Sequence, residues 1–317
     1  MRIGIDVMGG DFAPEQTVLG AIQARNQLLQ NIELVLIGDR SVIIPLLKKG
    51  NADESQFKIV HCTEVIGMAE HPTKVIQQKP DSSISKGFQL LKEGKIDSFA
   101  SAGNTGAMLV GSMFSVKAIP GILRPAIASL LPKESGGWGL ILDVGVNADC
   151  KPEVLQQFAV LGSIYAQNIL NIPLPKVALL SIGEEEEKGN LLVKETHQLL
   201  KATLDINFIG NVEGRDLFND KADVVVCDGF TGNVILKEAE SFYSMIKKRF
   251  IKDAYFDRFD YEDYGGTPIL GINSTVIIAH GISKAKAIKN MILLSASVVE
   301  AKLSEKIAAA FSKEIVK

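Results

Sequence analysis

Glycine-rich polar loops are the part of this sequence whose residue types and spacing could do chemistry. Most of them follow a short apolar run, and each combines glycine with Asn, Asp, Thr, His or a charged side chain. Glycine lets backbone N–H groups approach an anion, and a helix that begins after such a loop adds partial positive charge. The loops occupy residues 8–11, 102–107, 143–147, 182–190, 210–216, 228–233, 264–268 and 280–283. Together they predict one shared site for an anionic ligand.

Few cations are placed to complete such a site. Lys188 ends a run of four glutamates and stands directly before Gly189, where a helix is expected to start. We interpret the glutamates as a solvated charge run and Lys188 as the first candidate to hold the anion. Weaker candidates are Arg215, then Arg124, Lys86 and Lys237. His280 follows an apolar strand, so a core histidine and a ligand-binding histidine both stay open.

Several catalytic classes lack their sequence signature in this chain. There is no G-x-S-x-G elbow, no G-x-x-x-x-G-K-[ST] phosphate loop and no G-x-G-x-x-G after a predicted strand. The four histidines show no metal-ligand spacing. Cys62, Cys150 and Cys227 form no C-x-x-C pair, which argues against a disulfide framework and a cysteine zinc site. We therefore expect no metal site.

Composition predicts a folded, soluble α/β protein. The 317 residues carry 34 basic and 37 acidic side chains, a formal charge of −3, and 46% of them are hydrophobic. The slight acidic excess argues against nucleic-acid binding, which needs a basic face. Residues 1–6 already contain an acid and no apolar run reaches 18 residues, so we expect neither a signal peptide nor a membrane span. The expected location is the cytoplasm.

The elements that must position these loops follow from the hydrophobic pattern. Short apolar runs alternate with helical patterns, which predicts a mostly parallel sheet with flanking helices. Helices are expected after Pro14, with Val18 and Leu29 on its apolar face, and after Pro152. The expected strands are 2–7, 33–38, 57–62, 98–102, 126–131, 140–144, 176–182, 224–227 and 275–279. Residues 126–143 leave no room for a crossover helix and predict an antiparallel hairpin arm, and residues 284–315 predict one long helix or two.

Taken in order, the loop motifs resemble those of the PlsX family, the phosphate acyltransferases of bacterial phospholipid synthesis. The motifs are D-V-M-G-G-D, A-G-N-T-G-A, L-D-V-G-V-N, I-G-E-E-…-K-G-N, N-V-E-G-R-D, D-G-F-T-G-N, Y-G-G-T-P-I-L-G and H-G-I-S. They run in order from Ile3 to about Ala285, nearly the whole chain. An ordered set of this length is far more specific than any single glycine-rich loop.

The resemblance implies an enzyme that transfers a fatty acyl group from acyl carrier protein (ACP) to inorganic phosphate, giving acyl phosphate and free ACP. The acyl phosphate would then serve a glycerol-3-phosphate acyltransferase. The implied fold is similar to the isocitrate/isopropylmalate dehydrogenases and the phosphotransacetylases. It implies one unit over residues 1–317, made of two interwoven α/β subdomains around a central cleft. A homodimer that contacts the membrane face, without metal or organic cofactor, is implied as well.

The resemblance also implies roles for individual residues. Matching the family's K-G-N and D-G-F-T-G-N loops, Lys188 is expected to hold the phosphate charge and Asn233 to donate an amide hydrogen at the reacting carbonyl. The remaining candidates for phosphate or substrate binding are Asn104, Thr105, Gly106, Gly232, Thr231, Asp228, Asn147, Arg215 and His280.

Three other functions stay open at the level of sequence. The first is a phosphate acetyl- or butyryltransferase that uses acyl-CoA. The second is a metal-dependent decarboxylating dehydrogenase, for which we find no convincing carboxylate set. The third is a non-catalytic scaffold that binds ACP and membrane.

Residues 241–263 depart from the family, whose members commonly carry a longer helical hairpin with an apolar tip before Y-G-G. Here aromatic and aliphatic residues alternate with the basic cluster 247–249, and acids at 253, 257, 260, 262 and 263 follow. An interfacial helix for anionic lipid, a docking face for acidic ACP, and a packing or dimer contact all remain open.

Overall fold

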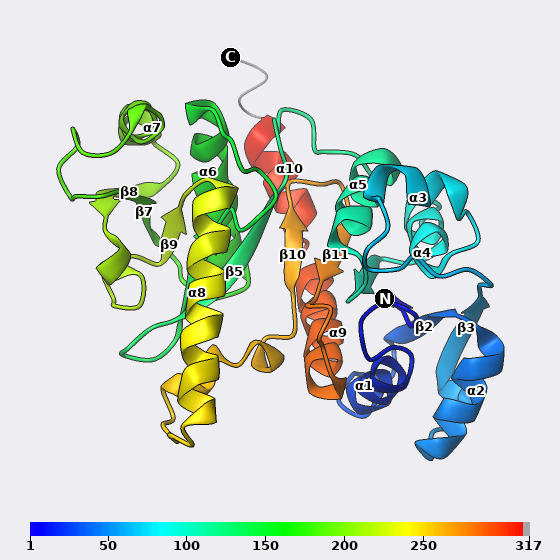
Figure 1. Ribbon diagram of the computed structural model, residues 1–317. Coiled ribbons are helices and arrows are strands. Elements are labelled where there is room, and N and C mark those ends of the chain that lie inside the picture. Colours follow the sequence, from blue (N-terminus) through cyan, green and yellow to red (C-terminus); the bar gives the residue numbers. More distant parts are fainter. Residues whose placement is uncertain (313–317) are drawn as a thin grey trace. The chain divides into compact units, whose positions relative to one another are not determined.

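The computed structural model describes residues 1–312 of the chain. The fold divides into two compact units (Figure 1). Unit 1 comprises Met1–Ala118 and Tyr261–Ser304, and unit 2 comprises Ile119–Asp260 together with the C-terminal residues from Glu305. The chain leaves unit 1 and later returns to it, so neither unit is one contiguous segment.

Unit 1 is built on a sheet with the strand order β3-β2-β1-β4-β11-β10. All of these strands run parallel except β10, which is antiparallel to β11. The strands are β1 (Arg2–Asp6), β2 (Glu33–Gly38), β3 (Phe57–His61), β4 (Ser98–Ser101), β10 (Thr267–Leu270) and β11 (Thr275–Ile278). Because β1, β4 and β11 are parallel neighbours, the loops that follow them meet at one edge of the sheet.

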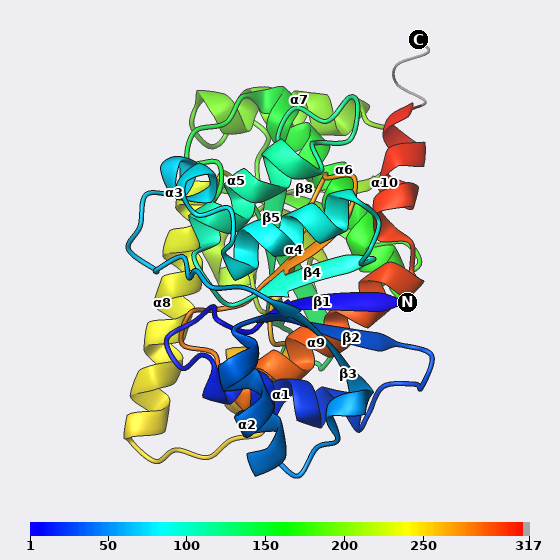
Figure 2. The ribbon, with the colours of Figure 1, turned by 90° about the vertical axis from the view of Figure 1, so that its right-hand side faces the viewer.

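Helices cover both faces of this sheet, with α4 and α5 on one face and α1 and α9 on the other (Figure 2). The helices are α1 (Glu15–Arg25), α2 (Arg40–Lys49), α3 (Pro72–Gln78), α4 (Ser83–Lys92), α5 (Thr105–Ser115) and α9 (Ala285–Glu300), with 3-10 turns at Glu54–Gln56 and Tyr261–Asp263. Side chains of Asp39, Ser82 and Asn104 cap α2, α4 and α5, which satisfies N–H groups without a helical partner. Burial from both sides explains why β2 is apolar along nearly its whole length.

Unit 2 contains a second sheet with the strand order β5-β6-β9-β7-β8. β5 and β6 form an antiparallel hairpin, and β6, β9, β7 and β8 are parallel. The strands are β5 (Ala126–Pro132), β6 (Trp138–Leu142), β7 (Lys176–Leu180), β8 (Asn207–Val212) and β9 (Val224–Val226). α6 packs on β6, β7 and β9, and α7 packs on β7 and β8. The helices are α6 (Pro152–Asn168), α7 (Leu191–Ala202), α8 (Gly229–Lys248) and α10 (Leu303–Ser312), with 3-10 turns at Gly214–Asp216 and Phe256–Phe259.

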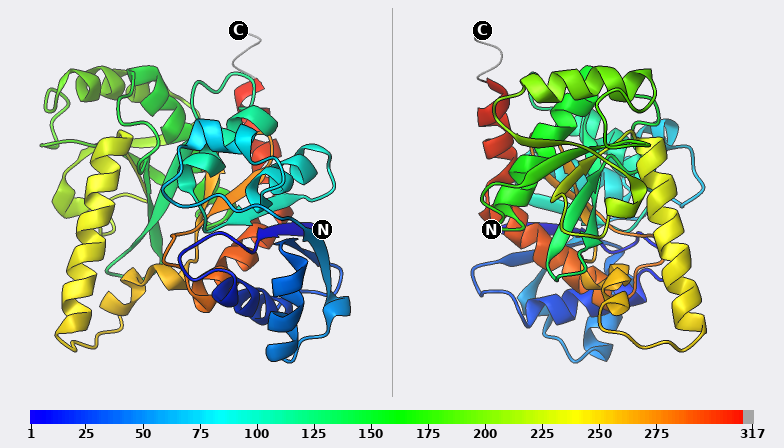
Figure 3. Two further views of the ribbon diagram at one scale, coloured as in Figure 1. Left: turned by 45° about the vertical axis from the view of Figure 1, so that its right-hand side comes forward. Right: turned by 90° about the vertical axis from the view of Figure 1, so that its left-hand side faces the viewer.

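α8 is buried only at its beginning. Gly229 and Gly232 are its buried residues, whereas Phe242 is 56% exposed and Phe250, just past the helix, is 88% exposed. Figure 3 shows the yellow helix lying along unit 2 with its C-terminal end away from the sheet. Among the described helices none is long and apolar enough to cross a membrane.

The predicted fold class is confirmed: parallel strands with flanking helices and one antiparallel hairpin at β5–β6. Two strands were not predicted, because β8 is a half-exposed edge strand and β10 is short and contains Pro268. The expected helix face at Leu29 is wrong, since α1 ends at Arg25 and Leu29 is 70% exposed. The C-terminal region forms two helices, and residues 313–315 of the predicted helix lie outside the described residues.

Candidate active site

The carboxyl ends of four parallel strands define one edge of the unit 2 sheet. β6, β9, β7 and β8 lie side by side in that order. The loops after them carry the predicted residues Asn147, Asp228, Thr231, Gly232, Asn233, Lys188 and Arg215. β7 and β9 are neighbours, so the Lys188 loop and the Asn233 loop extend from adjacent strands although they are distant in sequence.

Asp143, which the sequence motifs did not single out as a site residue, organises the loop after β6. Its side chain is fully buried and accepts hydrogen bonds from the backbone N–H groups of Ile127 at 3.0 Å and Asn147 at 2.6 Å. Burial raises the pKa of Asp143 above its ordinary value, although these hydrogen bonds act in the opposite direction. Its position directly after a buried strand is the signal that sequence reasoning could have used. An aspartate there is expected to be buried, and a buried aspartate needs hydrogen-bond partners.

Asn147 holds this loop against the start of α8. Its Nδ2 donates to the carbonyl oxygen of Pro125 at 2.8 Å and to Asp143 Oδ2 at 2.9 Å. Its own carbonyl oxygen accepts from the N–H of Gly229 at 2.7 Å. The side chain is therefore committed within the protein, and the ligand contact predicted for Asn147 stays a prediction.

The first turn of α8 rests on the same loop. Asp228 caps the helix, accepting from the backbone N–H and from the hydroxyl of Thr231, both at 2.8 Å. Gly232 lies so close to the carbonyl oxygen of Asp143 that a Cβ at this position would overlap it. Glycine is thus required at position 232 by close backbone approach, and the Asp228 cap holds the first turn of α8 against the loop after β6.

Asn233 presents its amide from this fixed turn. The residue is exposed, and a Cβ built at Gly145 would lie 3.4 Å from Asn233 Oδ1. Gly145 has a φ of +101°, which favours glycine. The amide of Asn233 therefore lies beside the loop after β6 and remains accessible to a ligand.

Lys188 is free of the glutamates that precede it. The side chain is exposed, and no carboxylate of the described residues lies within ion-pair distance of its ammonium. Glu184 instead pairs with Lys221 at 2.7 Å and Glu186 pairs with Lys201 at 2.8 Å. The stem of Lys188 packs on Gly183, where a Cβ would lie 2.8 Å from Lys188 Cγ. An uncompensated ammonium held on a folded loop is suited to bind an anion.

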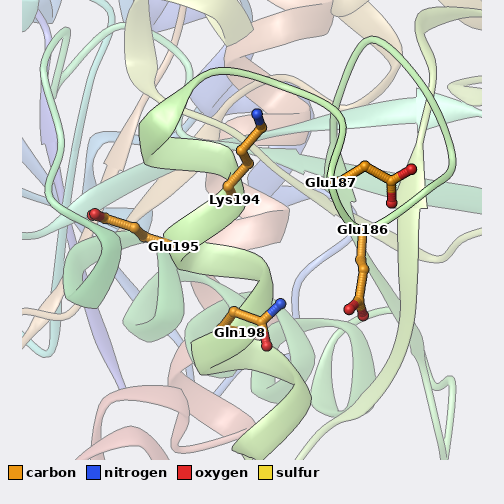
Figure 4. Close-up of a pocket in the computed structure, with 5 residues that line it drawn as sticks. All are labelled: Glu186, Glu187, Lys194, Glu195 and Gln198. Carbon is orange, nitrogen blue, oxygen red and sulfur yellow. The ribbon is translucent and has the colours of Figure 1, made fainter.

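The glutamates of this loop line a separate hollow that is unsuited to bind phosphate. Figure 4 shows a hollow lined by Glu186 and Glu187 from the loop and by Lys194, Glu195 and Gln198 from α7. Three carboxylates and one ammonium would repel a dianion more than attract it. We therefore do not place phosphate in this hollow.

Ser181 lies at the base of the Lys188 loop and was not predicted. Its hydroxyl is buried and makes no hydrogen bond with any described residue. A Cβ at Gly189, whose φ is +103°, would lie 3.0 Å from this hydroxyl. Buried hydroxyls normally form a hydrogen bond, so the unpaired Ser181 hydroxyl is a further candidate to donate to a ligand bound near Lys188. A serine directly after an apolar strand gives too common a pattern to single it out from sequence.

Arg215, unlike Lys188, forms ion pairs with neighbouring glutamates. Its side chain is 71% exposed, and the guanidinium pairs with Glu213 at 3.2 Å and with Glu184 at 4.0 Å. These are solvated surface pairs, which contribute little to stability. The predicted anion contact of Arg215 stays a prediction.

The remaining predicted residues lie in unit 1, at the edge formed by β1, β4 and β11. Asn104 is 5% exposed and its Oδ1 accepts from the N–H of Ala107 at 2.9 Å, capping α5. Thr105 is exposed and Gly106 is half-buried in the first turn of the same helix. The ring of His280 lies 5.0 Å from that of Tyr261. Asn104 and His280 thus follow the neighbouring strands β4 and β11.

The part of the chain that the structure describes holds no group of three or more His, Cys, Asp or Glu side chains arranged to bind a metal ion. Cys62, Cys150 and Cys227 are unpaired thiols. Burial raises the pKa of Cys150 to about 11, which makes it a poor thiolate nucleophile.

Comparison with known proteins shows the family of this chain. Residues 1–306 match the family described as "Fatty acid synthesis protein". A protein of Dictyoglomus turgidum named "Phosphate acyltransferase" is 46% identical, covering 99% of this chain and 98% of its own length. A protein of the same name from Halothermothrix orenii is also 46% identical, covering 94% and 95%.

Solved structures similar to this fold include phosphotransacylases. A phosphotransacetylase from Streptococcus pyogenes has a TM-score of 0.68 at 18% identity, covering 96% of this chain and 94% of its own. A branched-chain phosphotransacylase from Enterococcus faecalis has a TM-score of 0.65 at 15% identity, covering 94% and 99%. At such identities the likeness establishes the fold alone.

Fold and sequence relationship together define an acyltransferase with a two-unit α/β architecture. Within that class, the chain belongs to the PlsX family, as its ordered loop motifs indicated.

Proposed function

We propose that this protein transfers a fatty acyl group from the thioester of acyl-ACP to inorganic phosphate, giving acyl phosphate and free ACP for phospholipid synthesis. Membership in a family of phosphate acyltransferases supports phosphate as the acceptor. One observation carries the proposal. The Lys188 ammonium follows β7 and the Asn233 amide follows the neighbouring strand β9, and neither group is bonded to another described side chain.

The chemistry needs no protein nucleophile. A phosphate oxygen attacks the thioester carbon, the carbonyl π pair moves to oxygen, and the tetrahedral intermediate collapses as the C–S bond breaks. The thiolate leaves and takes up a proton; a free thiol has a pKa of about 8.5, so the departing sulfur needs only modest acid assistance. The protein's tasks are therefore to position phosphate and to stabilise the oxyanion.

The two residues divide these tasks by their chemistry. The Lys188 ammonium offsets the charge of the phosphate dianion as it approaches the carbonyl. Asn233 Nδ2 donates to the carbonyl oxygen as negative charge develops there, supported by the partial positive charge at the α8 N-terminus. Asp143 and Asn147 hold the first turn of α8 in place by the bonds described above.

The exposed surface of α8 bears on the partners and the location of the enzyme. The exposed outer half of α8, with Phe242 and the basic cluster 247–249, provides a surface for the homodimer partner, for acidic ACP or for anionic lipid at the membrane face. We propose a cytoplasmic enzyme that contacts the membrane peripherally and hands acyl phosphate to a glycerol-3-phosphate acyltransferase.

The deciding experiment measures thiol release from palmitoyl-ACP with and without inorganic phosphate. We expect release that depends on phosphate and an acyl phosphate product that hydroxylamine traps. The same assay with acetyl-, butyryl- and palmitoyl-CoA tests the alternative that the fold of the phosphotransacetylases favours. Faster turnover of the CoA thioesters would show that acyl-CoA, and not acyl-ACP, is the acyl donor. Folded protein without any phosphate-dependent thiol release would support the non-catalytic scaffold instead.

A further inference from the structure

Three large apolar side chains lie exposed at the loop edge of unit 1. Phe12 is 42% exposed, Met68 is 45% exposed and Ile282 is 51% exposed. We call these three residues the apolar rim. We propose that the apolar rim binds the acyl chain of the substrate and that Asn104 positions it; this inference rests on the proposed function.

Three separate segments bring the rim together around Gly281. The N–H of Asp11, next to Phe12, donates to the carbonyl oxygen of Gly281 at 2.7 Å. A Cβ at Gly281 would lie 2.7 Å from Met68 Cε, so the methionine packs directly on this glycine. Ile282 follows Gly281 in the chain, and its carbonyl oxygen accepts from the hydroxyl of Tyr261 at 3.0 Å. The rim residues therefore belong to three segments that meet at Gly281. The carboxylate of Asp11 lies beside the same glycine, and the Lys284 ammonium lies 5.7 Å from the Phe12 ring centroid, so charged groups border the apolar side chains.

The position of the rim indicates what it binds. It adjoins the loops after β1, β4 and β11, the edge that also carries Thr105 and His280. Exposed apolar side chains that gather at one place mark a binding surface, whereas scattered ones need no explanation. A fatty acyl chain is the apolar part of the proposed substrate, and an unbranched methionine adapts readily to a flexible chain.

Asn104 fixes the segment that carries Met68. Its Nδ2 lies within hydrogen-bond distance of the carbonyl oxygens of Gly67 at 3.1 Å, Met68 at 3.1 Å and Glu70 at 3.0 Å. An amide nitrogen has two hydrogens, so these three acceptors leave no donor for phosphate. Lys79 supports the same segment, since its Nζ lies 2.6 Å from Glu70 Oε1 and 2.7 Å from the carbonyl oxygen of Val65. Asn104 is thus a positioning residue for the rim.

The closing experiment compares octanoyl-ACP with palmitoyl-ACP at saturating phosphate. In Met68→Ala and in Ile282→Gln we expect the palmitoyl-to-octanoyl ratio of kcat/KM to fall about tenfold, because buried methylenes each contribute a several-fold preference. The KM for phosphate should not change. Met113→Ala is the matched control, an exposed methionine of α5 outside the rim, 40% exposed, and it should keep the wild-type ratio.

Asn104→Ala separates the two roles of that residue. We expect it to lower the chain-length ratio as Met68→Ala does, with an unchanged KM for phosphate. A raised KM for phosphate with an unchanged ratio would overturn the positioning role. Met68→Gln, of similar length, covers the case in which Met68→Ala does not fold.

The outcomes separate this inference from the proposed function. Wild-type protein that turns over both thioesters, with rim variants that keep the wild-type ratio, refutes the rim alone. Wild-type protein that releases no thiol from either thioester refutes the proposed function and the rim with it.

Discussion

At the scale of single residues, what distinguishes Lys188 and Asn233 is that neither forms a hydrogen bond or ion pair with another described side chain. Asn147 and Asn104, by contrast, use their amides inside the protein. The sequence could predict all of these polar residues but could not rank them, because a capping asparagine and a ligand-binding asparagine occur in the same glycine-rich context. The difference lies in partners from distant segments.

Replacing Lys188 or Asn233 is expected to lower activity without unfolding the protein. Each of Lys188→Ala and Asn233→Ala should reduce phosphate-dependent kcat/KM by about 100-fold, the effect typical of removing a fixed group that stabilises developing charge. For Lys188→Ala the KM for phosphate should also rise. Steady-state kinetics measures both, and circular dichroism checks the fold.

Lys194→Ala is the matched control, since Lys194 lies on α7 and lines the acidic hollow beside the same loop (Figure 4). It should keep nearly full activity. A folded Lys188→Ala protein with wild-type kinetics would show that the phosphate is held elsewhere.

At the scale of elements, side-chain caps and single carboxylates join loops to helices. Asp81 shows how, because its Oδ2 accepts from the backbone N–H of Thr63 at 2.9 Å and from the Thr63 hydroxyl at 2.5 Å. Lys86 Nζ lies 3.3 Å from Asp81 Oδ1. These contacts tie the loop after β3 to the start of α4. The pattern of polar residues indicated a loop there, but not that Thr63 and Asp81 would meet.

This junction predicts how stability depends on pH. The hydrogen bonds from Thr63, followed by the one from Lys86, lower the pKa of Asp81 to about 2. A carboxyl with a lowered folded-state pKa contributes its stability above the unfolded-state pKa of about 3.9 and loses it as pH falls through the folded-state pKa. In urea titrations, Asp81→Asn should therefore show a smaller loss of stability between about pH 4 and pH 2 than wild type.

Asp205→Asn, at an exposed position outside this junction, controls for the loss of one surface carboxylate and should behave as wild type. An Asp81→Asn protein with the wild-type pH dependence would mean that the contacts with Thr63 do not persist in solution.

At the scale of the whole molecule, each unit presents one polar loop edge, and α8 adds an exposed apolar and basic surface. On the outer half of α8 and just past it, Phe242, Met245, Phe250 and Ile251 are each at least 46% exposed. The segment after α8 is in turn anchored, because Tyr255 donates to the carbonyl oxygen of Pro132 at 3.1 Å and the Arg258 guanidinium lies 4.7 Å from the Trp138 ring centroid. The exposed C-terminal end of α8, followed by a segment anchored to the β5–β6 hairpin, suits contact with a membrane surface or a protein partner.

Vesicle flotation tests the membrane part of this picture. Wild type should float with vesicles of phosphatidylglycerol and phosphatidylcholine, and Phe250→Asp should bind them about tenfold more weakly, because an exposed phenylalanine that enters the lipid is replaced by a charge that anionic lipid repels. Leu204→Asp, at a position 96% exposed elsewhere in unit 2, should float as wild type does. Equal flotation of all three proteins would exclude a membrane role for Phe250.

The sequence by itself determined the α/β class, the parallel strands, the β5–β6 hairpin and the family, because these depend on local pattern: apolar runs, turn residues and ordered motifs. It also identified the loops that carry the candidate site. Tertiary structure alone decided that Asp143 is buried against the start of α8, that the Lys188 ammonium forms no ion pair with the neighbouring glutamates, and that Met68 and the backbone of Asp11 contact Gly281. These facts depend on contacts between segments far apart in the chain, and such contacts leave no local spacing in the sequence.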